Sequence, residues 1–186
     1  MSASSAGWAR RQPSCSTVAS SVSRRRAGAT LVVIPCDTAH HWLAEPRKAV
    51  TVPILDMIEI TANAVAAHRP PIGSVGLLAT SGTVRVGLYQ RALEPHGINA
   101  LSPPADEQET VMTAIHTIKS GRRDCRDSLV AAAESLQRRG AEGVILGCTE
   151  IPLVLAEGDL PVPIFDPLRL LARASIAAVD EGSDAP

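Results

Sequence analysis

Two cysteines in matching sequence settings are the residues of this chain best suited to chemistry. Cys36 ends the apolar run 29–35, and Cys148 ends the run 141–147. A threonine follows each cysteine within two residues. A thiolate and a thiol on opposite faces of one atom can remove a proton from one side and return one from the other. The pair therefore predicts a proton-transfer reaction that needs a base and an acid.

A second matching segment lies downstream of each cysteine. Residues 52–56 read VPILD and residues 162–166 read VPIFD, and an apolar helical pattern follows both. The spacing from cysteine to proline is 17 residues in one copy and 15 in the other. This internal duplication predicts one thiol at the end of a buried strand in each half. We expect the two thiols to face one another across a cleft.

The expected position of both cysteines also bears on their reactivity. Each should enter a turn that opens a helix, where the partial positive charge of the helix N-terminus lowers the pKa of a thiol. A single buried cysteine is more often an inert apolar residue, so it is the matched pair that favours catalysis. Cys15 and Cys125 lack a strand-end setting and are interpreted as incidental.

Polar residues beside the first thiol extend the candidate site. Asp37, Thr38 and Ala39 form the turn after Cys36. Thr38 could cap a helix or donate a hydrogen bond to a ligand carboxylate. His40 and the histidine after it could join the cysteines in a zinc site, but the spacing matches no standard zinc motif. No metal is predicted, and His40 is expected to orient a side chain near the thiol.

A small-residue turn provides a second group of candidates. Thr80 and Ser81 follow the apolar run 74–79, and free backbone N–H groups at such a turn can bind an anion. Ser81 could equally be only a helix N-cap. Lys119 is by default a solvated lysine at a helix end, and Glu150 is by default an acid in the first turn of a helix.

The composition favours a globular protein with an aliphatic core, because 45% of the residues are hydrophobic and only 2% aromatic. The 186 residues can form one domain or two small lobes. A net charge of −1 predicts no binding to nucleic acid, and no apolar run approaches the ~20 residues of a membrane span. Four cysteines are too few for a disulfide framework, so we expect a cytoplasmic protein.

Residues 1–28 differ in composition from the rest of the chain. They hold eight serines and five arginines, and no acid occurs before Asp37. A transit peptide or a twin-arginine signal would have some of these properties. The favoured interpretation is an unstructured or wrongly assigned start, because this composition cannot bury a core.

Strand and helix patterns alternate after residue 28, which predicts α/β layers with a mainly parallel sheet. The expected strands are short aliphatic runs, as in sheets covered on both faces. They cover 29–35, 52–55, 74–79, 97–101, 142–147 and 162–165. The expected helices cover 57–68, 83–95, 106–118, 124–139, 150–157 and 167–179.

A break at residues 68–73, where two prolines and a glycine occur, divides this pattern. We expect residues 29–71 plus 164–180 to form a first α/β lobe and residues 72–163 to form a second. The first lobe would hold only two strands, too few for an independent sheet, so it is predicted to be incomplete.

Several stretches resemble the cofactor-independent aspartate/glutamate racemase family, and within it the aspartate racemases. The resemblance runs from about residue 29 to residue 179 in the family's order. Its most specific part is the pair of cysteine motifs at this spacing. The matching stretches are VVIPCDTAH, VPILDMIEITANAV, VGLLATSGT, VGLYQRAL, EQETVMTAIHTIKSG, GAEGVILGCTEIPLVL and LPVPIFDP.

The resemblance implies two pseudo-symmetric α/β lobes that enclose a small amino-acid substrate, and a homodimer. It implies a racemase that interconverts L- and D-aspartate or a related acidic amino acid. Cys36 and Cys148 would be the catalytic thiols: one removes the α-proton as a thiolate, and the other returns a proton from the opposite face. Neither pyridoxal phosphate nor another cofactor or metal is implied.

The resemblance also implies a set of substrate-binding residues. Lys119 matches a lysine that binds the side-chain carboxylate of the substrate, which favours acidic amino acids. Hydroxyl groups after the strands would hold the α-carboxylate and the amino group. The full expected set is Asp37, Thr38, Ala39, Thr80, Ser81, Lys119, Thr149 and Glu150.

Two departures from the family pattern support an alternative function. Residues 1–28 contain no counterpart of the family's glycine-rich first strand or of a following arginine that binds the distal carboxylate. Position 37 is Asp where the family motif has Asn, and an ionised Asp would repel a substrate carboxylate ~4 Å away by about 4 kcal/mol at an effective dielectric near 20. The alternative is a truncated, catalytically silent member that at most binds small carboxylates. A relative acting on hydantoins or maleate is a third hypothesis.

Overall fold

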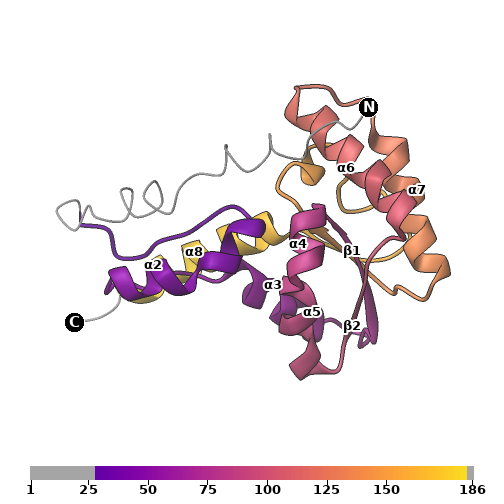
Figure 1. Cartoon of the computed structure of the whole chain (residues 1–186). Helices are drawn as coiled ribbons and strands as arrows, with labels where there is room; N and C mark the ends of the chain where they lie inside the picture. Colours follow the sequence, from indigo (N-terminus) through magenta and orange to yellow (C-terminus); the bar gives the residue numbers. More distant parts are fainter. Residues whose placement is uncertain (1–27, 184–186) are drawn as a thin grey trace.

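A parallel sheet of four strands forms the centre of the protein. The computed structural model describes residues 28–183, so Cys15 and the prediction for residues 1–28, apart from its last residue, lie outside the described residues. The strands lie in the order β2-β1-β3-β4 (Figure 1). Their bounds are β1 Ser74–Ala79, β2 Asn99–Leu101, β3 Val144–Gly147 and β4 Ile164–Phe165, and every pairing is parallel. The predicted α/β class is confirmed.

Helices cover both faces of this sheet, which explains why its strands read as continuous apolar runs. Leu78 of β1 faces a core cluster formed with α6 (Ala105–Lys119) and α7 (Arg126–Arg138). The preceding residue, Leu77, faces a second cluster formed with α3 (Met57–Ala66) and α5 (Leu88–Leu93). Successive side chains of a strand point to opposite faces, so both of these leucines are fully buried.

Two predicted helices differ from the structure. The expected helix 83–95 is instead α4 (Ser81–Val86), α5 and the 3-10 helix η4 (Glu94–His96). It breaks at Gly87, whose φ of 69° is one that glycine adopts without strain. The expected helix 150–157 is wrong, because only the short 3-10 helix η5 (Ile151–Leu153) forms there.

A side-chain contact accounts for the loop that follows η5. The backbone N–H of Ala156 donates to Asp159 Oδ2 at 2.7 Å instead of continuing a helix. The apolar residues of this stretch still serve the core, since Ile151 and Leu155 are fully buried. Their helix-like spacing therefore reflects burial in a loop and not a regular helix.

The segment before β1 packs against the C-terminal helix, and its helix α3 also covers one face of the sheet. It contains η3 (Thr38–Trp42), α2 (Ala44–Ala49) and α3, and α3 packs on α8 (Pro167–Ser183). Figure 1 shows α2 and α8 extending together away from the sheet.

The two strands expected in this first segment are not formed. Only an isolated parallel bridge joins Val32 to Ile54. Among the described residues no further strand lies beside this pair. Because two strands alone are only marginally stable, the pairing does not extend into a longer ladder. The division into 29–71 plus 164–180 and 72–163 stays a prediction.

The internal duplication is visible in the register of the chain. Val32, four residues before Cys36, pairs with Ile54, and Val144, four residues before Cys148, pairs with Ile164. The backbone repeats as well: the N–H of Val32 donates to the carbonyl of residue 53, and that of Val144 to the carbonyl of residue 163, both at 2.9 Å. Both copies thus direct a cysteine to the same end of a parallel pair.

The aspartates that close the repeated VPI-x-D segments have one role in common. Asp56 caps α3 by accepting hydrogen bonds from the N–H groups of Ile58 and Glu59. Asp166 caps the start of α8 through Leu168 and Arg169 in the same way. An N-cap carboxylate satisfies free N–H groups of the first turn, which is why a helix begins directly after each copy. None of the helices in residues 28–183 is long and apolar enough to cross a bilayer.

Candidate active site

The carboxyl end of the sheet brings several predicted residues together. Ala79, the last residue of β1, pairs with Gly147, the last residue of β3. Thr80 and Cys148 therefore leave the sheet side by side. Ligands of open parallel sheets bind at this end of the strands, so the position of Cys148 is the one that the apolar run before it predicts.

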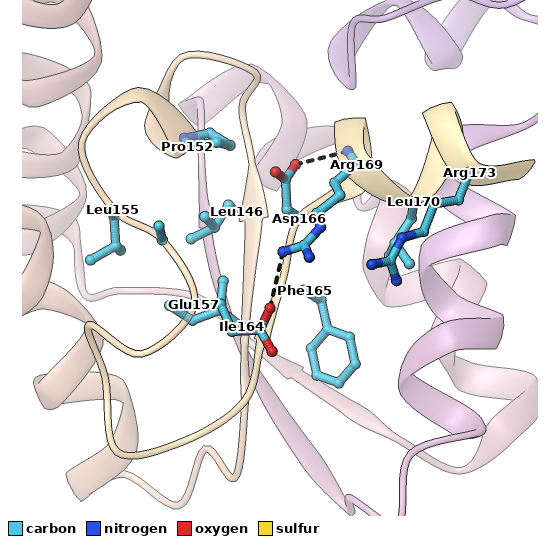
Figure 2. A pocket seen from close by; sticks show the side chains of 11 residues that line it. Leu146, Pro152, Leu155, Glu157, Ile164, Phe165, Asp166, Arg169, Leu170 and Arg173 are labelled. Carbon is cyan, nitrogen blue, oxygen red and sulfur yellow. Dashed lines mark hydrogen bonds and ion pairs between the residues drawn. The ribbon is translucent and has the colours of Figure 1, made fainter. Parts of the chain in front are cut away.

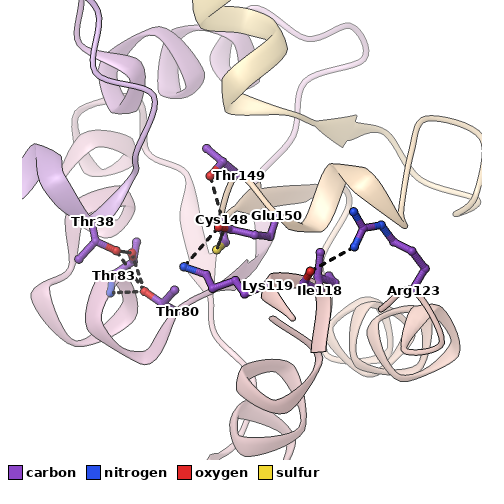
Figure 3. Close-up of polar contacts among 9 residues, drawn as sticks. All are labelled: Thr38, Thr80, Thr83, Ile118, Lys119, Arg123, Cys148, Thr149 and Glu150. Carbon is purple, nitrogen blue, oxygen red and sulfur yellow. Dashed lines mark hydrogen bonds and ion pairs between the residues drawn. The ribbon is translucent and has the colours of Figure 1, made fainter. Parts of the chain in front are cut away.

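Three threonine hydroxyls tie the Cys36 turn to this edge. Thr38 Oγ1 lies 3.2 Å from Thr80 Oγ1 and 2.7 Å from Thr83 Oγ1, and the last two lie 3.0 Å apart (Figure 3). Thr80 is also the N-cap of α4, because its hydroxyl accepts from the N–H of Thr83. Ser81, which could have been the cap, is the first residue of the helix instead.

His40 fixes the backbone at Cys36. Its Nε2 accepts a hydrogen bond from the N–H of Met57 at 3.1 Å. Its Nδ1 lies 2.9 Å from the carbonyl of Cys36 and, with Nε2 accepting, it donates there. The imidazole is buried between the thiol's turn and the start of α3. His40 therefore holds backbone groups, the Cys36 carbonyl and the Met57 N–H, and not the side chain that it was expected to orient near the thiol.

Asp37 points into the interior and not toward an open site. Its side chain is only 3% exposed, and Tyr89 of α5 donates a hydrogen bond to Oδ1. Oδ2 is buried without a hydrogen-bond partner among the described residues. Burial raises the pKa of Asp37 to about 6, with smaller contributions from the charges of Asp166 and Glu150, while the Tyr89 hydrogen bond opposes the rise. A carboxyl with this pKa is still mostly ionised at pH 7, so the repulsion expected from an ionised Asp37 is not removed by the shift.

Cys148, Glu150 and Lys119 form a connected group beside the threonines (Figure 3). The thiol of Cys148 donates to Glu150 Oε2 at 2.9 Å, and Thr149 Oγ1 donates to the same oxygen at 3.3 Å. Lys119 Nζ, at the end of α6, lies 3.3 Å from Glu150 Oε1. Lys119 and Glu150 thus have more specific contacts than their default helix-end interpretations suggest.

The electrostatics of this group favour the protonated form of the Cys148 thiol. Burial, followed by the hydrogen bond and charge of Glu150, raises the pKa of the Cys148 thiol well above its usual range. Burial alone would raise the pKa of Glu150, but the thiol hydrogen bond and the Lys119 charge outweigh it and lower that pKa. The expectation of a lowered thiol pKa is therefore wrong for Cys148, because burial and an adjacent carboxylate dominate over any helix terminus.

The two thiols have different surroundings. Cys36 is exposed whereas Cys148 is buried, so the prediction that each ends a buried strand holds only for Cys148. The reason is that the run 29–35 forms a single bridge and lies at the surface. Cys125 is buried near the carbonyl of Ala114, which agrees with a packing role.

The remaining predicted residues lie around this edge. Ser81 receives a hydrogen bond from Gln108 Nε2 at 3.3 Å, and its own N–H donates to the sulfur of Met112 at 3.2 Å. Ala39 is half-buried in η3. In the described part of the chain no cluster of three or more histidine, cysteine or acidic side chains is arranged to hold a metal ion.

One pocket is lined by neither of the two thiols (Figure 2). It has a volume of about 190 Å³ and lies between the loop after η5 and the start of α8. Arg169 crosses it to pair with Glu157 at 3.0 Å. None of the predicted catalytic or substrate-binding residues lines it.

Two residues of the site were missed in the sequence. Thr83 completes the hydroxyl cluster, and its place one turn after Thr80 could have indicated it. Tyr89 binds Asp37 from 52 residues away in the chain, and no local pattern pairs the two. Tyr89 is the only tyrosine in the sequence, and it is fully buried. Its contact with the carboxyl of Asp37 arises from tertiary packing and not from a local sequence pattern.

The chain is similar to known racemases in sequence and in fold. The sequence pattern of the Asp/Glu/Hydantoin racemase family matches residues 1–175. The aspartate racemase of Picrophilus torridus superposes with a TM-score of 0.76 at 26% identity, over 89% of this chain and 69% of the other.

Two curated relatives extend the comparison. A glutamate racemase of Corynebacterium kroppenstedtii is 32% identical over 161 residues, which are 86% of this chain and 53% of that protein. The broad specificity amino-acid racemase of Bacillus subtilis is 26% identical over 157 residues, 84% of this chain and 67% of its own length. The chain thus spans about half of that glutamate racemase.

Proposed function

Because the chain belongs to the Asp/Glu/Hydantoin racemase family, whose members among its relatives are isomerases, we propose that it racemises an acidic amino acid, with aspartate as the first candidate. Cys36 and Cys148 are the proposed catalytic thiols. One removes the α-proton as a thiolate, and the other returns a proton from the opposite face. The reverse direction exchanges these roles, and the step needs no cofactor.

The observation that carries this proposal is the meeting of the two cysteine segments at one sheet edge. Thr38, two residues after Cys36, lies 3.2 Å from Thr80, which leaves the sheet beside Cys148. This contact supports the proposal that each half of the duplication supplies one thiol to a common region. A resting thiol at Cys148, hydrogen-bonded to Glu150, supports the role of proton donor.

The charge at the site supports an acidic substrate. The ammonium of Lys119 is half exposed and lies beside the thiol group, where it can attract a side-chain carboxylate. We propose that Thr38, Thr80, Ser81 and Thr149, together with the turn at Ala39, hold the α-carboxylate and the amino group. Aspartate and glutamate differ by one methylene, so the length of the site decides between them.

The test is proton NMR of the purified chain with L-aspartate, and then with L-glutamate, in deuterated buffer under reducing conditions. We expect loss of the α-proton signal together with appearance of the D form in chiral analysis. In Cys36→Ala and in Cys148→Ala, racemisation should fall below detection because each lacks one of the two proton-transferring groups. Cys15→Ala is the matched control and should racemise normally.

Two results would contradict this proposal. Undiminished racemisation in Cys148→Ala would reject the two-thiol mechanism. A folded wild-type chain that binds aspartate but exchanges no α-proton would favour the silent, carboxylate-binding alternative.

We also propose that the protein acts in the cytoplasm as a homodimer. Its ligand is a small amino acid, and it does not bind nucleic acid. The near-neutral net charge of −1 supports the absence of nucleic-acid binding. Exposed apolar residues on the first segment and on α8 support self-association.

A further inference from the structure

Tyr89 contacts the neighbours of both cysteines. Its hydroxyl donates a hydrogen bond to Oδ1 of Asp37, the residue that follows Cys36. Its ring lies against Gly147, the residue that precedes Cys148, because a Cβ built on this glycine would be only 3.1 Å from Tyr89 Cε2. The tyrosine side chain is fully buried. One aromatic side chain therefore spans the interval between the two thiol segments.

The turn at Cys36 has few other attachments to the rest of the molecule. The chain before it forms a single bridge, so no strand ladder fixes the turn. The hydrogen bonds of His40 stay within the segment before β1. In the described chain, the side-chain hydrogen bonds that join residues 36–40 to the segments after β1 begins are those of Thr38 and Asp37. The position of Cys36 therefore depends on side-chain contacts more than on a strand.

The charge of Asp37 strengthens the hydrogen bond from Tyr89. Burial raises the pKa of Asp37 to about 6, and the charges of Asp166 and Glu150 add to the rise, so at pH 7 the acceptor is mostly a carboxylate. Burial and the charge of Asp37 hold the pKa of Tyr89 well above its ordinary value, so the phenol keeps the proton that it donates. The charge of Asp56 acts on Tyr89 in the same direction. A hydrogen bond to an ionised group is roughly twice as strong as one between neutral groups.

We propose that Tyr89 is a positioning residue that sets the distance between the two catalytic thiols by holding the Cys36 turn against the end of β3. The inference rests on the proposed function, because the two thiols must reach opposite faces of one α-carbon. A displacement of about 1 Å in such a site can reduce the rate on the order of 100-fold. Tyr89 touches no reacting atom and acts through Asp37 and Gly147.

The first test detects the contact without any assay of activity. Tyr89 is the only tyrosine of the chain, so carbon-13 labelling of the tyrosine Cζ atom gives a single NMR signal. In the full wild-type chain this signal should titrate with Asp37, at a pH of about 6. In Asp37→Asn the titration should disappear, although the amide oxygen still accepts the hydrogen bond. A signal that does not titrate, or that titrates equally in Asp37→Asn, would overturn the inference.

The second test removes the tyrosine hydroxyl alone. Tyr89→Phe keeps the ring against Gly147, so the variant should fold, as circular dichroism will show. Its kcat for racemisation should fall on the order of 100-fold. Its KM should change little, because α6, which carries Lys119, covers the face of the sheet opposite α5. The matched control is Thr113→Val, which removes a hydroxyl that bonds only within α6, and it should racemise as wild type does.

Single-thiol backgrounds show which thiol is displaced. Cys36→Ala leaves exchange of the α-proton to Cys148, and Cys148→Ala leaves it to Cys36, so both enantiomers of aspartate are offered in deuterated buffer. Adding Tyr89→Phe should leave exchange by Cys148 unchanged, because the pairing of β3 with β1 holds that thiol. Exchange by Cys36 should slow on the order of 100-fold. A general loss of structure would reduce both exchanges together.

A double-mutant cycle tests whether Tyr89 acts through Asp37. Asp37→Leu removes the acceptor, so adding Tyr89→Phe to it should cause no further loss of kcat. Asp37→Asn keeps an acceptor oxygen, so Tyr89→Phe should still lower kcat in that background. Losses that multiply in the Asp37→Leu background would show that the two residues act independently.

Three activity results would overturn the inference: an unchanged kcat in Tyr89→Phe, an equal loss of exchange by both thiols, and losses that multiply in the cycle. If the folded wild-type chain exchanges no α-proton, the proposed function fails, and amide hydrogen exchange of residues 36–42 then reports on the turn. Faster amide exchange there in Tyr89→Phe than in wild type supports the positioning role, and identical exchange refutes it.

Discussion

At the scale of single residues, the buried carboxyl of Asp37 links the candidate site to stability. Its pKa in the folded chain is raised from 3.8 to about 6 by burial. The folded state therefore binds this proton more tightly than the unfolded state does. The contribution of the protonated Asp37 carboxyl to the free energy of unfolding is therefore fully present below about pH 4. This contribution is lost as the pH rises toward 6.

The variant Asp37→Asn tests this linkage, because an amide cannot ionise. Two pKa units correspond to on the order of 3 kcal/mol, so the free energy of unfolding of the variant, relative to wild type, should increase by about that amount between pH 4 and pH 7. Urea unfolding across this pH range measures it. The cost of burying the amide does not change with pH, because the amide does not titrate over this range. Parallel stability curves for the two proteins would contradict the buried, proton-binding carboxyl.

At the scale of elements, the close packing of β3 on β1 sets the position of Cys148. A Cβ on Gly147 would lie 2.9 Å from Leu77 Cδ1, 3.0 Å from Ala79 Cβ and 3.1 Å from the ring of Tyr89. Overpacking of a core costs about 1–3 kcal/mol. Gly147→Ala should therefore lower the free energy of unfolding by this amount and displace both the thiol and the tyrosine that binds Asp37.

The matched control for this prediction is Gly82→Ala in α4. Its added Cβ would meet neighbours only at ordinary contact distances, the nearest at 3.6 Å. Alanine favours a helix over glycine by roughly 1 kcal/mol, so this variant should be as stable as wild type or more so. Equal urea midpoints for Gly147→Ala and wild type would show that the sheet relaxes without cost.

The elements that could be predicted from the sequence are those whose signals are local. The run 74–79 is a strand with the predicted bounds, and α3 and α8 begin directly after the repeated VPI-x-D segments, whose aspartates cap them. The run 29–35 has the same apolar character but forms one bridge, because a strand also needs partners that sequence composition does not reveal. Likewise, the contact of Tyr89 with Asp37 depends on how α5 packs.

At the scale of the whole molecule, the distribution of exposed apolar side chains is uneven. Five large hydrophobic residues of the described chain are exposed, and only Leu153 lies outside the first segment and α8. The other four are Val33, Trp42, Ile176 and Val179. Ile176 and Val179 are three residues apart, so they lie on one face of α8. Exposed apolar side chains gathered in one region indicate an interaction surface.

We expect this surface to drive association of two copies of the chain. The double variant Ile176→Glu/Val179→Glu places charges on the α8 face, and burying them in an interface without partners is costly. Sedimentation velocity over a range of concentrations should show a wild-type dimer and a monomeric double variant. Leu153→Glu introduces a charge at an equally exposed site away from α8 and should leave the dimer intact. A wild-type monomer at every concentration, or an equally dimeric double variant, would reject α8 as the contact. Because both substitutions lie at solvent-facing positions, the double variant should fold, and its far-ultraviolet circular dichroism should match that of wild type.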